Sequence, residues 1–349
     1  MTDILSDDYK LDFCDVMIVP KESNLNSRKE VNSIRKFEFK NGIKLNCCPI
    51  IAANMDTVGT FSMAKSLKSH EMMTCLHKYY TLDKYEEFFE THKSNNYFIT
   101  VGSSEEERYK FNNIWNIRHR YTEEPIFINI DIANGYIPQL REAIKYYRKT
   151  YENSVISAGN ICTPEGVRIL ANAGADICKA GIGSSGFCLT RQKAGVGYPQ
   201  FSMILECQEE ADKQGIYLIS DGGCTCPGDI AKAFCAGADF VMLGGMLAGH
   251  DECEVEFYRN EHGEEYCFSH GMSSSTAMLK YNGNIPSHRT SEGRTVSIKA
   301  KGPVNNTLLD IEGGLRSCGT YIGAETLEKF AGRTNFVKVY HQLNTSLVK

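Results

Sequence analysis

Several features that would assign this chain to a large functional class are missing from its sequence. There is no dense Lys/Arg cluster, and the formal net charge is -5 with a pI near 6.0, so the electrostatic footprint of a nucleic-acid-binding protein is absent. No uninterrupted apolar run reaches membrane-spanning length, and the stretch Met1 to Asp8 is polar and acidic, unlike a signal peptide. These absences predict a cytoplasmic protein that binds neither nucleic acid nor a membrane.

The cysteines also lack a recognisable framework. All 14 are scattered through the chain without the paired C-x-x-C spacing of a zinc site or the spacing of a disulfide scaffold. Without a secretory signal they are expected to be reduced thiols. We interpret Cys47, Cys48, Cys224 and Cys226 as core residues.

Cys188 has different surroundings. It lies in the glycine-rich segment Gly181–Gln200, called here the Cys188 loop, which reads G-I-G-S-S-G-F-C-L-T-R-Q-K-A-G-V-G-Y-P-Q. Glycines ahead of the cysteine let the backbone adopt positive φ and pass close to a ligand. Thr190 offers a hydroxyl for proton transfer, and Arg191 a cation that favours the thiolate. The alternative is a glycine-rich surface loop with an incidental cysteine. The loop alone does not distinguish this alternative from a nucleophilic cysteine, so the residues around it are needed.

Short apolar runs alternate with amphipathic stretches along most of the chain. The runs predicted as strands are Pro49–Asn54, Met73–His77, Tyr97–Val101, Ile126–Ile130, Ser154–Ala158, Ala175–Lys179, Tyr217–Ser220 and Ala238–Leu243. The stretches predicted as helices are Phe61–Ser69, Leu82–His92, Ser104–His119, Ile137–Tyr151, Pro164–Ala173, Phe201–Gln214 and Pro227–Ala236. Eight such units indicate an α/β fold with a closed (β/α)8 TIM barrel. An open doubly wound sheet is the alternative, but no G-x-G-x-x-G opens a helix after the first strand.

Two long connections interrupt this alternation. The Cys188 loop separates the sixth and seventh predicted strands, and Gly249 to Lys301 is a polar insertion after the eighth. Long segments without regular periodicity are usually lids or binding loops. We see no linker, low-complexity tract or domain boundary. Residues 1–349 are therefore predicted to form a single catalytic domain, in which residues 249–301 are an insertion, called here the flap.

Polar residues gather where the predicted strands end, the rim at which barrel enzymes carry their active sites. They are Asn54 to Asp56, His77-Lys78, Asp131 to Gly135, Gly159-Asn160, the Cys188 loop, Asp221 to Gly223 and Gly244-Gly245. The double glycines offer backbone N–H groups to a phosphate, and Gly271 to Ser274 offers more. Asp221 suits paired sugar hydroxyls, so the rim predicts a nucleotide substrate.

Four longer segments resemble the IMP dehydrogenase/GMP reductase family, and the resemblance runs nearly end to end. They are Ile50–Ser62, Gly195–Gln200, Ser220–Gly228 and Asp239–Met246. The resemblance implies that Cys188 is the nucleophile that attacks C2 of a purine nucleotide.

The two branches of that family differ in ways visible in the sequence. Dehydrogenases activate water with an Arg-Tyr pair on a mobile flap and usually carry inserted CBS modules. Here Lys78 to Asp131 leaves no room for the insertion, and Ser287–Arg294 lacks the pair. Similarity to the reductase branch implies NADPH-dependent conversion of GMP to IMP and ammonia in purine salvage, with Thr190 and Glu292 moving the ammonia proton. A dehydrogenase without CBS modules and a catalytically silent nucleotide-binding protein are the alternatives.

The resemblance also implies binding residues and assembly. The implied substrate set is Asp221, Gly222, Gly223, Gly244, Gly245, Gly271, Met272, Ser273, Arg289, Thr290, Ser291 and Gly293. The implied NADPH set is Ser27, Arg28, Lys78, Asp131, Ile132, Ala133, Ile182, Gly183, Met272, His288, Arg289, Ser317, Cys318, Gly319 and Thr320. The family is typically tetrameric, so a homotetramer is expected.

The Cys188 loop departs from the family's usual G-x-G-P-G-S-x-C-T-T-R. The altered positions are Ser184, Ser185, Gly186 and Leu189. Relatives build a potassium site here from main-chain carbonyls, which in this chain would be those of Gly183, Ser185, Cys188 and Arg191. We expect looser cation coordination, because the substitutions redirect the carbonyls. Gly186 also removes a phosphate hydroxyl that Ser184 or Ser185 could replace.

Overall fold

A computed structural model describes residues 8–285, 287 and 290–340 of the chain. Eight parallel strands close a barrel in the order β10-β11-β4-β5-β6-β7-β8-β9. The strands are β4 (Ile50–Ala52), β5 (Met73–Leu76), β6 (Tyr97–Val101), β7 (Ile126–Asp131), β8 (Ser154–Ile161), β9 (Ile177–Ala180), β10 (Tyr217–Asp221) and β11 (Phe240–Leu243). The predicted TIM barrel is confirmed, each strand overlaps its predicted run, and closure rules out the doubly wound sheet.

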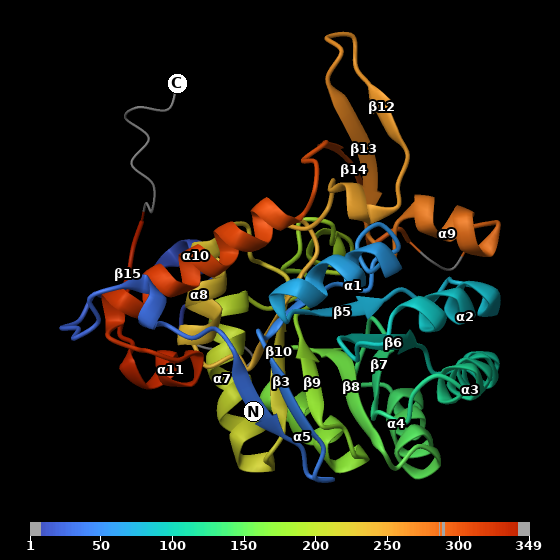
Figure 1. Cartoon of the computed structure of the whole chain (residues 1–349), viewed down its shortest axis with the longest axis horizontal. Coiled ribbons are helices and arrows are strands. Elements are labelled where there is room, and N and C mark those ends of the chain that lie inside the picture. The colour runs from blue at the N-terminus through green and yellow to red at the C-terminus, as the bar shows by residue number, and fades with distance from the viewer. Residues whose placement is uncertain (1–7, 286, 288–289, 341–349) are drawn as a thin grey trace.

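Helices follow the strands and surround the barrel (Figure 1). They are α1 (Phe61–Leu67), α2 (Leu82–Thr91), α3 (Glu105–His119), α4 (Pro138–Thr150), α5 (Pro164–Ala173), α7 (Gln200–Gln214), α8 (Pro227–Cys235) and α10 (Asn305–Ile322). Helix α5 begins at Pro164, as predicted, and its N-cap Thr163 Oγ1 accepts a hydrogen bond of 3.3 Å from Gly166 N. Helix α10 has no predicted counterpart, because the flap separates it from the eighth strand.

Side chains on the inner face of the strands fill the barrel, and a hairpin closes one of its ends. The hairpin consists of β2 (Arg35–Glu38) and β3 (Lys44–Cys47). Its Phe37 ring stacks on Phe240 at a centroid distance of 4.2 Å and meets Tyr217, the first residue of β10, edge to face at 5.1 Å. The hairpin therefore covers the amino ends of the strands, which leaves the carboxyl ends free to form a site.

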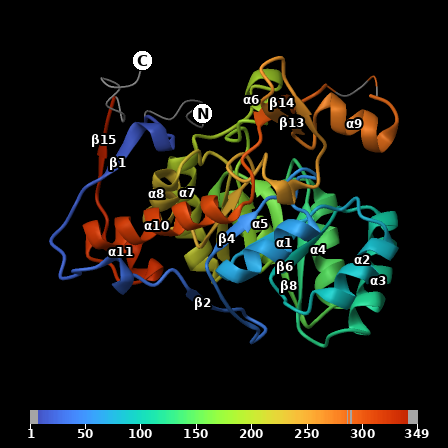
Figure 2. The same ribbon diagram turned by 45° about the horizontal axis from the view of Figure 1, so that its top comes forward.

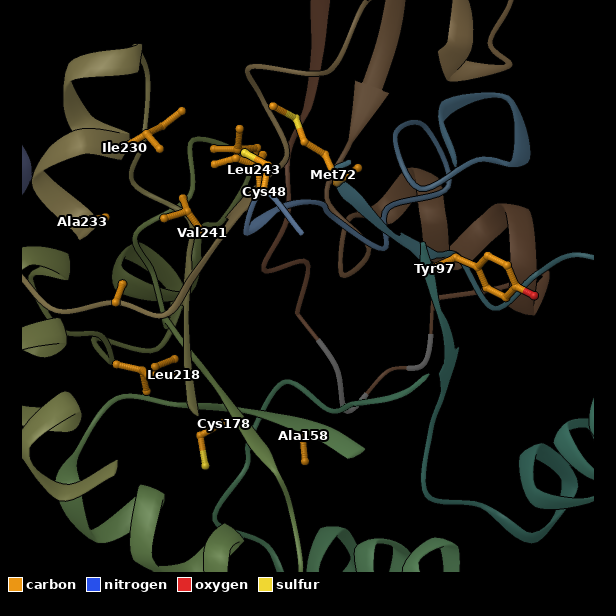
Figure 3. Close-up of a cluster of buried hydrophobic side chains, with 14 of the residues drawn as sticks. Cys48, Met72, Tyr97, Ala158, Cys178, Leu218, Ile230, Ala233, Val241 and Leu243 are labelled. Atoms are coloured by element: carbon orange, nitrogen blue, oxygen red, sulfur yellow. The ribbon is translucent and has the colours of Figure 1, made fainter. Parts of the chain in front are cut away.

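The outer face of the barrel packs against the helices. In Figure 3, Leu218 and Val241 lie on strands on the side where Ile230 and Ala233 of α8 are found, and all four are fully or almost fully buried. The alternation continues along β9, where Ile177 faces the interior and Cys178 the helices. Lys179 is next and points inward, so a charged side chain enters the barrel just below its rim.

The flap is more regular than its sequence suggested. It contains a three-stranded antiparallel sheet of β12 (Phe257–Arg259), β13 (Glu265–His270) and β14 (Thr295–Lys299), which projects beyond the barrel (Figure 1), and helix α9 (Ser275–Asn282). The flap thus contains strands and a helix that the sequence analysis did not predict. These strands are short and mostly exposed, so they lack the continuous buried apolar runs that mark the barrel strands. The division of the chain into one domain and a flap remains a prediction.

Short elements complete the fold. Strands β1 (Val16–Ile18) and β15 (Phe336–Lys338) pair antiparallel and bring the two ends of the described chain together. The rest are α6 (Thr190–Lys193), α11 (Phe330–Arg333), η1 (Phe13–Asp15), η2 (Arg28–Glu30), η3 (Lys68–His70), η4 (Asp251–Cys253) and η5 (Leu327–Lys329). None of the helices in the described ranges is both long and apolar enough to cross a membrane.

The cysteines divide by position. All 14 are free thiols, and Cys47 and Cys48 are buried as predicted. Cys226 is exposed, so its interpretation as a core residue is wrong, whereas half-buried Cys224 packs against the edge of the core. Both lie in the loop that follows β10 at the rim, where the chain leaves the packed barrel.

Candidate active site

The flap and the Cys188 loop are joined beside the nucleophile. Cys188 and Gly293 form an antiparallel bridge. Leu189 N donates to Glu292 O at 2.6 Å, and Arg294 N donates to Phe187 O at 3.0 Å. Figure 2 shows the result, with α6 lying next to β13 and β14. Residues about 100 positions apart in sequence are therefore held in register across the site.

Cys188, Thr190 and Glu292 form a hydrogen-bonded chain. The Cys188 thiol donates to Thr190 Oγ1 at 3.2 Å, and the Thr190 hydroxyl donates to Glu292 Oε2 at 2.7 Å. All three side chains are half-buried. Every donor points toward the carboxylate, so the arrangement can carry a proton between sulfur and carboxylate.

A second flap segment, at Ser273, holds the backbone of Glu292 in place. Glu292 N and Gly293 N both donate to Ser273 O, at 3.1 and 3.2 Å. A Cβ on Gly293 would lie 2.7 Å from Ser274 N, so only glycine allows this close approach of two backbones. Ser291 Oγ donates to Gly293 O at 2.9 Å and fixes the same turn.

A cavity of about 300 Å³ adjoins the Cys188 loop, and we call it the rim pocket. Its lining residues are Ser184, Ser185, Gly186, Phe187, Gly222, Gly223, Cys224, Thr225, Met242, Leu243, Gly244, Gly245, Met246 and Lys301. Within the described residues, the N–H groups of the two glycine pairs donate no hydrogen bond. Four free donors around one cavity suit an anion such as a phosphate.

The two serines of the altered loop are not equivalent. Ser184 Oγ donates its proton to Asp221 O at 3.1 Å. Ser185 Oγ instead accepts from Phe187 N at 3.2 Å, so its own proton is free for a ligand. Ser185 is therefore the better substitute for the hydroxyl that Gly186 lacks.

A charged network lies inside the barrel at the carboxyl ends of its strands. Lys179 is 2% exposed, its Nζ contacts Asp131 and Asn160, and it lies 3.6 Å from Asp221 Oδ2. Burial alone would lower the pKa of Lys179, but the charges of Asp131 and Asp221 raise it. Burial likewise opposes ionisation of Asp131, yet Lys179 holds the pKa of that carboxyl below its usual value. One buried cation thus favours the charged form of Asp131 and lies within ion-pair distance of Asp221.

The sequence as a whole identifies the family to which this site belongs. Residues 10–344 match the family described as "IMP dehydrogenase / GMP reductase domain". The chain is 47% identical to the GMP reductase of Photobacterium profundum over 97% of its own length and 98% of that protein. It is 46% identical to human GMP reductase 1, with 97% of each chain covered, and equally close to a GMP reductase of Vibrio cholerae.

The chain belongs to the IMP dehydrogenase/GMP reductase family.

The cofactor residues expected of this family fall into two groups. Lys78, Asp131, Ile132, Ala133, Ile182 and Gly183 belong to the rim and the start of the Cys188 loop. Ser27 and Arg28 belong to the η2 region, which packs against α10, the helix that carries Ser317, Cys318, Gly319 and Thr320. Ser317 and Cys318 line a separate cavity of about 400 Å³ that shares no residue with the rim pocket. The chain by itself does not bring the two groups to one pocket.

The rim group has donors and acceptors that fit a nicotinamide ring. The Asp131 carboxylate, at the end of β7, can accept a hydrogen bond from the amide of the nicotinamide. Lys78 follows β5, which is separated from β7 by one strand, β6. Lys78 Nζ already pairs with Glu107 Oε1 at 2.6 Å, so its charge is largely neutralised. Exposed Arg28 in the other group carries a cation suited to a cofactor phosphate. Gly319 is required by packing, since a Cβ there would lie 2.7 Å from Val31 Cγ1.

The remaining substrate residues of the family belong to the flap. Gly271 N donates to Arg294 O at 3.1 Å, beside the join with the Cys188 loop. Met272 Sδ accepts from Asp56 N at 3.4 Å, and Ser273 supports Glu292 as described above. Thr290 is exposed. His288 and Arg289, expected at the cofactor and substrate, lie outside the described residues.

The loop does not use Arg191 as the sequence suggested. Its guanidinium binds Asp12 Oδ2 at 3.1 Å and Tyr198 O at 2.7 Å, so its charge is neutralised away from the thiol. The expectation that Arg191 favours the Cys188 thiolate is therefore not supported. The Thr190 hydroxyl is the group in contact with that sulfur, and it connects the sulfur to the Glu292 carboxylate.

The expected potassium site rests on main-chain oxygens. Ser185 O already accepts a 3.0 Å hydrogen bond from Cys188 N, which leaves one lone pair for a cation. Gly183 has φ of +80°, and a Cβ on it would lie 2.5 Å from Arg191 Cγ, so this turn requires glycine. In the described residues, no group of three or more His, Cys, Asp or Glu side chains could hold a metal ion.

Two functional candidates were missed as site residues by sequence reasoning. Lys179 carried a signal, because a lysine inside an otherwise apolar parallel strand is unusual unless it is paired. Asp56 was noted only as a rim residue. Its side chain is 1% exposed and accepts hydrogen bonds from Lys280 Nζ at 2.7 Å and Tyr281 Oη at 2.5 Å, both on α9. It therefore anchors the flap to the barrel, a role that no local sequence pattern reveals.

Proposed function

We propose that the chain catalyses the NADPH-dependent reductive deamination of GMP to IMP and ammonia. The single observation that carries the proposal is the Cys188–Thr190–Glu292 hydrogen-bonded chain. It combines a nucleophile with a proton relay, which is what exchange of an amine at an electrophilic purine carbon requires. The names of the relatives, GMP reductase in each case cited, support the same activity.

The first half of the reaction uses residues of the chain alone. Glu292 takes the thiol proton through Thr190, and the Cys188 sulfur then forms a bond to C2 of the purine. That proton, returned through Thr190, converts the 2-amino group to ammonia as the C2–N bond breaks, which leaves a thioimidate on Cys188. A nicotinamide cofactor bound at the rim would supply the hydride for C2. The C2–S bond then breaks, and the thiolate recovers a proton through Thr190 from Glu292, which takes it from solvent.

The rim pocket is the site proposed to bind the phosphate of the nucleotide. In this proposal its glycine N–H groups and Ser185 hold the 5′-phosphate, Asp221 holds the ribose hydroxyls, and Gly271, Met272, Ser273, Ser291 and Gly293 line the purine. The phosphate would therefore be bound on one side of Cys188 and the base covered by the flap. Closure around the base also excludes water, which would hydrolyse the thioimidate.

Dehydrogenase activity is the less well supported alternative. It requires a general base that activates water at the thioimidate, and that role belongs to an Arg-Tyr pair that the flap lacks. Glu292 in contrast accepts a hydrogen bond from Thr190, which connects it to the Cys188 thiol. A catalytically silent binding protein would have no need for this chain of three side chains.

Further properties follow from family membership and are part of the proposal. The cofactor is NADPH, with Arg28 facing its extra phosphate. A potassium ion binds the carbonyls of the Cys188 loop. The active form is a homotetramer, which would supply the α10 group of cofactor residues to the rim of a neighbouring copy. The enzyme is cytoplasmic and serves purine salvage.

The absorbance of NADPH tests the proposal and separates its alternatives. With GMP present, the NADPH band should fall and IMP should accumulate. With IMP and NAD, no NADH band should rise. Formation of NADH would identify a dehydrogenase, and no change in either mixture, despite nucleotide binding, would identify a silent binding protein.

A further inference from the structure

The rim pocket has a single charged residue in its lining, Lys301. Its Nζ donates to the carbonyls of Gly245 at 3.3 Å and Met246 at 3.0 Å, both of which also line the cavity. Among the described residues, no carboxylate forms an ion pair with it. Although the side chain is exposed as a whole, burial around its ammonium lowers the pKa of Lys301. A partly desolvated cation without an anion therefore stands at the wall of an anion pocket.

The backbone of Lys301 is fixed independently of the outer part of the flap. Lys301 N donates to Gly249 O at 2.9 Å, so the two ends of the flap meet at this point. His250 Nδ1 lies 2.8 Å from Gly302 O and holds the next residue. Lys301 thus belongs to the base of the flap and keeps its place beside Gly245 whether or not the outer flap moves.

The other hydrogen-bond donors of the rim pocket do not compensate the negative charge of a phosphate. Gly186 has no hydroxyl, and the Ser184 proton is engaged by Asp221 O. The remaining donors are neutral, namely backbone N–H groups and Ser185. A phosphate monoester carries between one and two negative charges at neutral pH, so neutral donors alone leave its charge uncompensated.

From these contacts we infer that Lys301 is the cationic ligand of the nucleotide's 5′-phosphate and makes this chain select nucleotides over nucleosides. On phosphate binding its ammonium exchanges one or both carbonyl partners for phosphate oxygens. The inference rests on the proposed function, since it names the recognition of the substrate at the same site.

Binding of GMP and guanosine by equilibrium dialysis tests this role. Lys301→Met should weaken GMP binding by roughly tenfold to a hundredfold, the range for a hydrogen bond between charged groups, and leave guanosine binding unchanged. Lys301→Arg should retain most of the GMP affinity. The control is Lys299→Met, because Lys299 Nζ pairs with Glu264 Oε1 at 2.6 Å on the exposed sheet, and it should change neither constant.

The outcomes separate this inference from the proposed function. If Lys301→Met weakens GMP and guanosine equally, Lys301 only shapes the pocket wall through the two carbonyls, and the inference is wrong. If the variant weakens neither ligand, the inference is also wrong while the proposed function stands. If the unsubstituted protein prefers neither nucleotide nor nucleoside, both are overturned.

Discussion

Thr190 Oγ1 lies 2.7 Å from Glu292 Oε2, although 102 positions separate the two residues in the chain. Thr190 begins α6 in the Cys188 loop, and Glu292 comes from the returning arm of the flap. The relay therefore exists only when loop and flap are joined. The backbone hydrogen bonds of Leu189 and Arg294 join the two segments. In the proposed mechanism, the flap therefore covers the purine base and completes the proton relay at the same time.

Replacing Cys188 by alanine should abolish turnover and leave the dissociation constant of GMP within roughly tenfold, because only the covalent step needs sulfur. Steady-state rates and equilibrium binding measure the two effects. Cys226→Ala is the matched control, since this thiol is exposed at the same rim and has no place in the mechanism. Appreciable turnover by the Cys188 variant would assign the nucleophile to another residue.

Interrupting the relay should slow loss of ammonia more than binding. Thr190→Val and Glu292→Gln are each expected to lower kcat by a factor on the order of 10²–10⁴ with little change in GMP affinity. Thr190→Ser keeps the hydroxyl and should recover most of the rate. Rapid-quench measurement of ammonia release follows the step. A Thr190→Ser variant as slow as Thr190→Val would mean that threonine acts by packing.

Stability should fall as the pH decreases from about 6.5 to 4, partly through His77. Burial lowers the pKa of His77 from its ordinary 6.5 to about 4. In this window the unfolded chain binds a proton that the folded protein excludes, so stability present above pH 6.5 is progressively lost, on the order of 3 kcal/mol for this group. Nδ1 accepts from Tyr79 N at 3.2 Å, as the neutral ring requires.

Urea unfolding at pH 7 and pH 5 measures the contribution of His77. His77→Gln retains an acceptor for Tyr79 N but cannot titrate, so its free energy of unfolding should change less between the two pH values. His262→Gln, at an exposed position before β13, should behave like the unsubstituted protein. Equal pH dependence in all three proteins would exclude His77 as a source of acid lability.

Potassium should stimulate this chain only weakly. Ser184 and Ser185 replace residues of the usual family loop, and the Ser185 carbonyl already accepts from Cys188 N. Titration of KCl against an organic cation at constant ionic strength measures the response. A steep, saturable requirement for potassium would show that the site is intact despite the substitutions.

The barrel could be predicted because each strand is a local apolar run with a helix behind it. Tyr97–Val101, for example, is buried at every position and needs no distant partner to be recognised. Cys188 and Thr190 were also accessible, since they are neighbours in a distinctive loop. The same holds for the glycine pairs that follow β10 and β11, because strand ends converge on one rim.

Other parts of the site depend on contacts between distant segments. The burial of Asp56 beneath α9 follows from where Lys280 and Tyr281 fold back, and no pattern around residue 56 encodes it. Arg191 looked like a partner of Cys188 by sequence proximity, yet Asp12 from the far N-terminal segment binds it. The flap sheet escaped prediction because its strands are short and mostly exposed, and their pairing joins segments that are distant in the sequence.

The account depends most directly on transfer of a hydride to purine C2 with loss of the 2-amino group. The decisive measurement is mass spectrometry of the nucleotide formed from GMP and NADPH deuterated at C4 of the nicotinamide, with ammonia assayed in parallel. The account predicts IMP one mass unit heavier than natural IMP from one stereoisomer of the labelled cofactor, and one ammonia for each IMP. IMP without deuterium from either stereoisomer, or unconverted GMP with fully active cofactor, would contradict it.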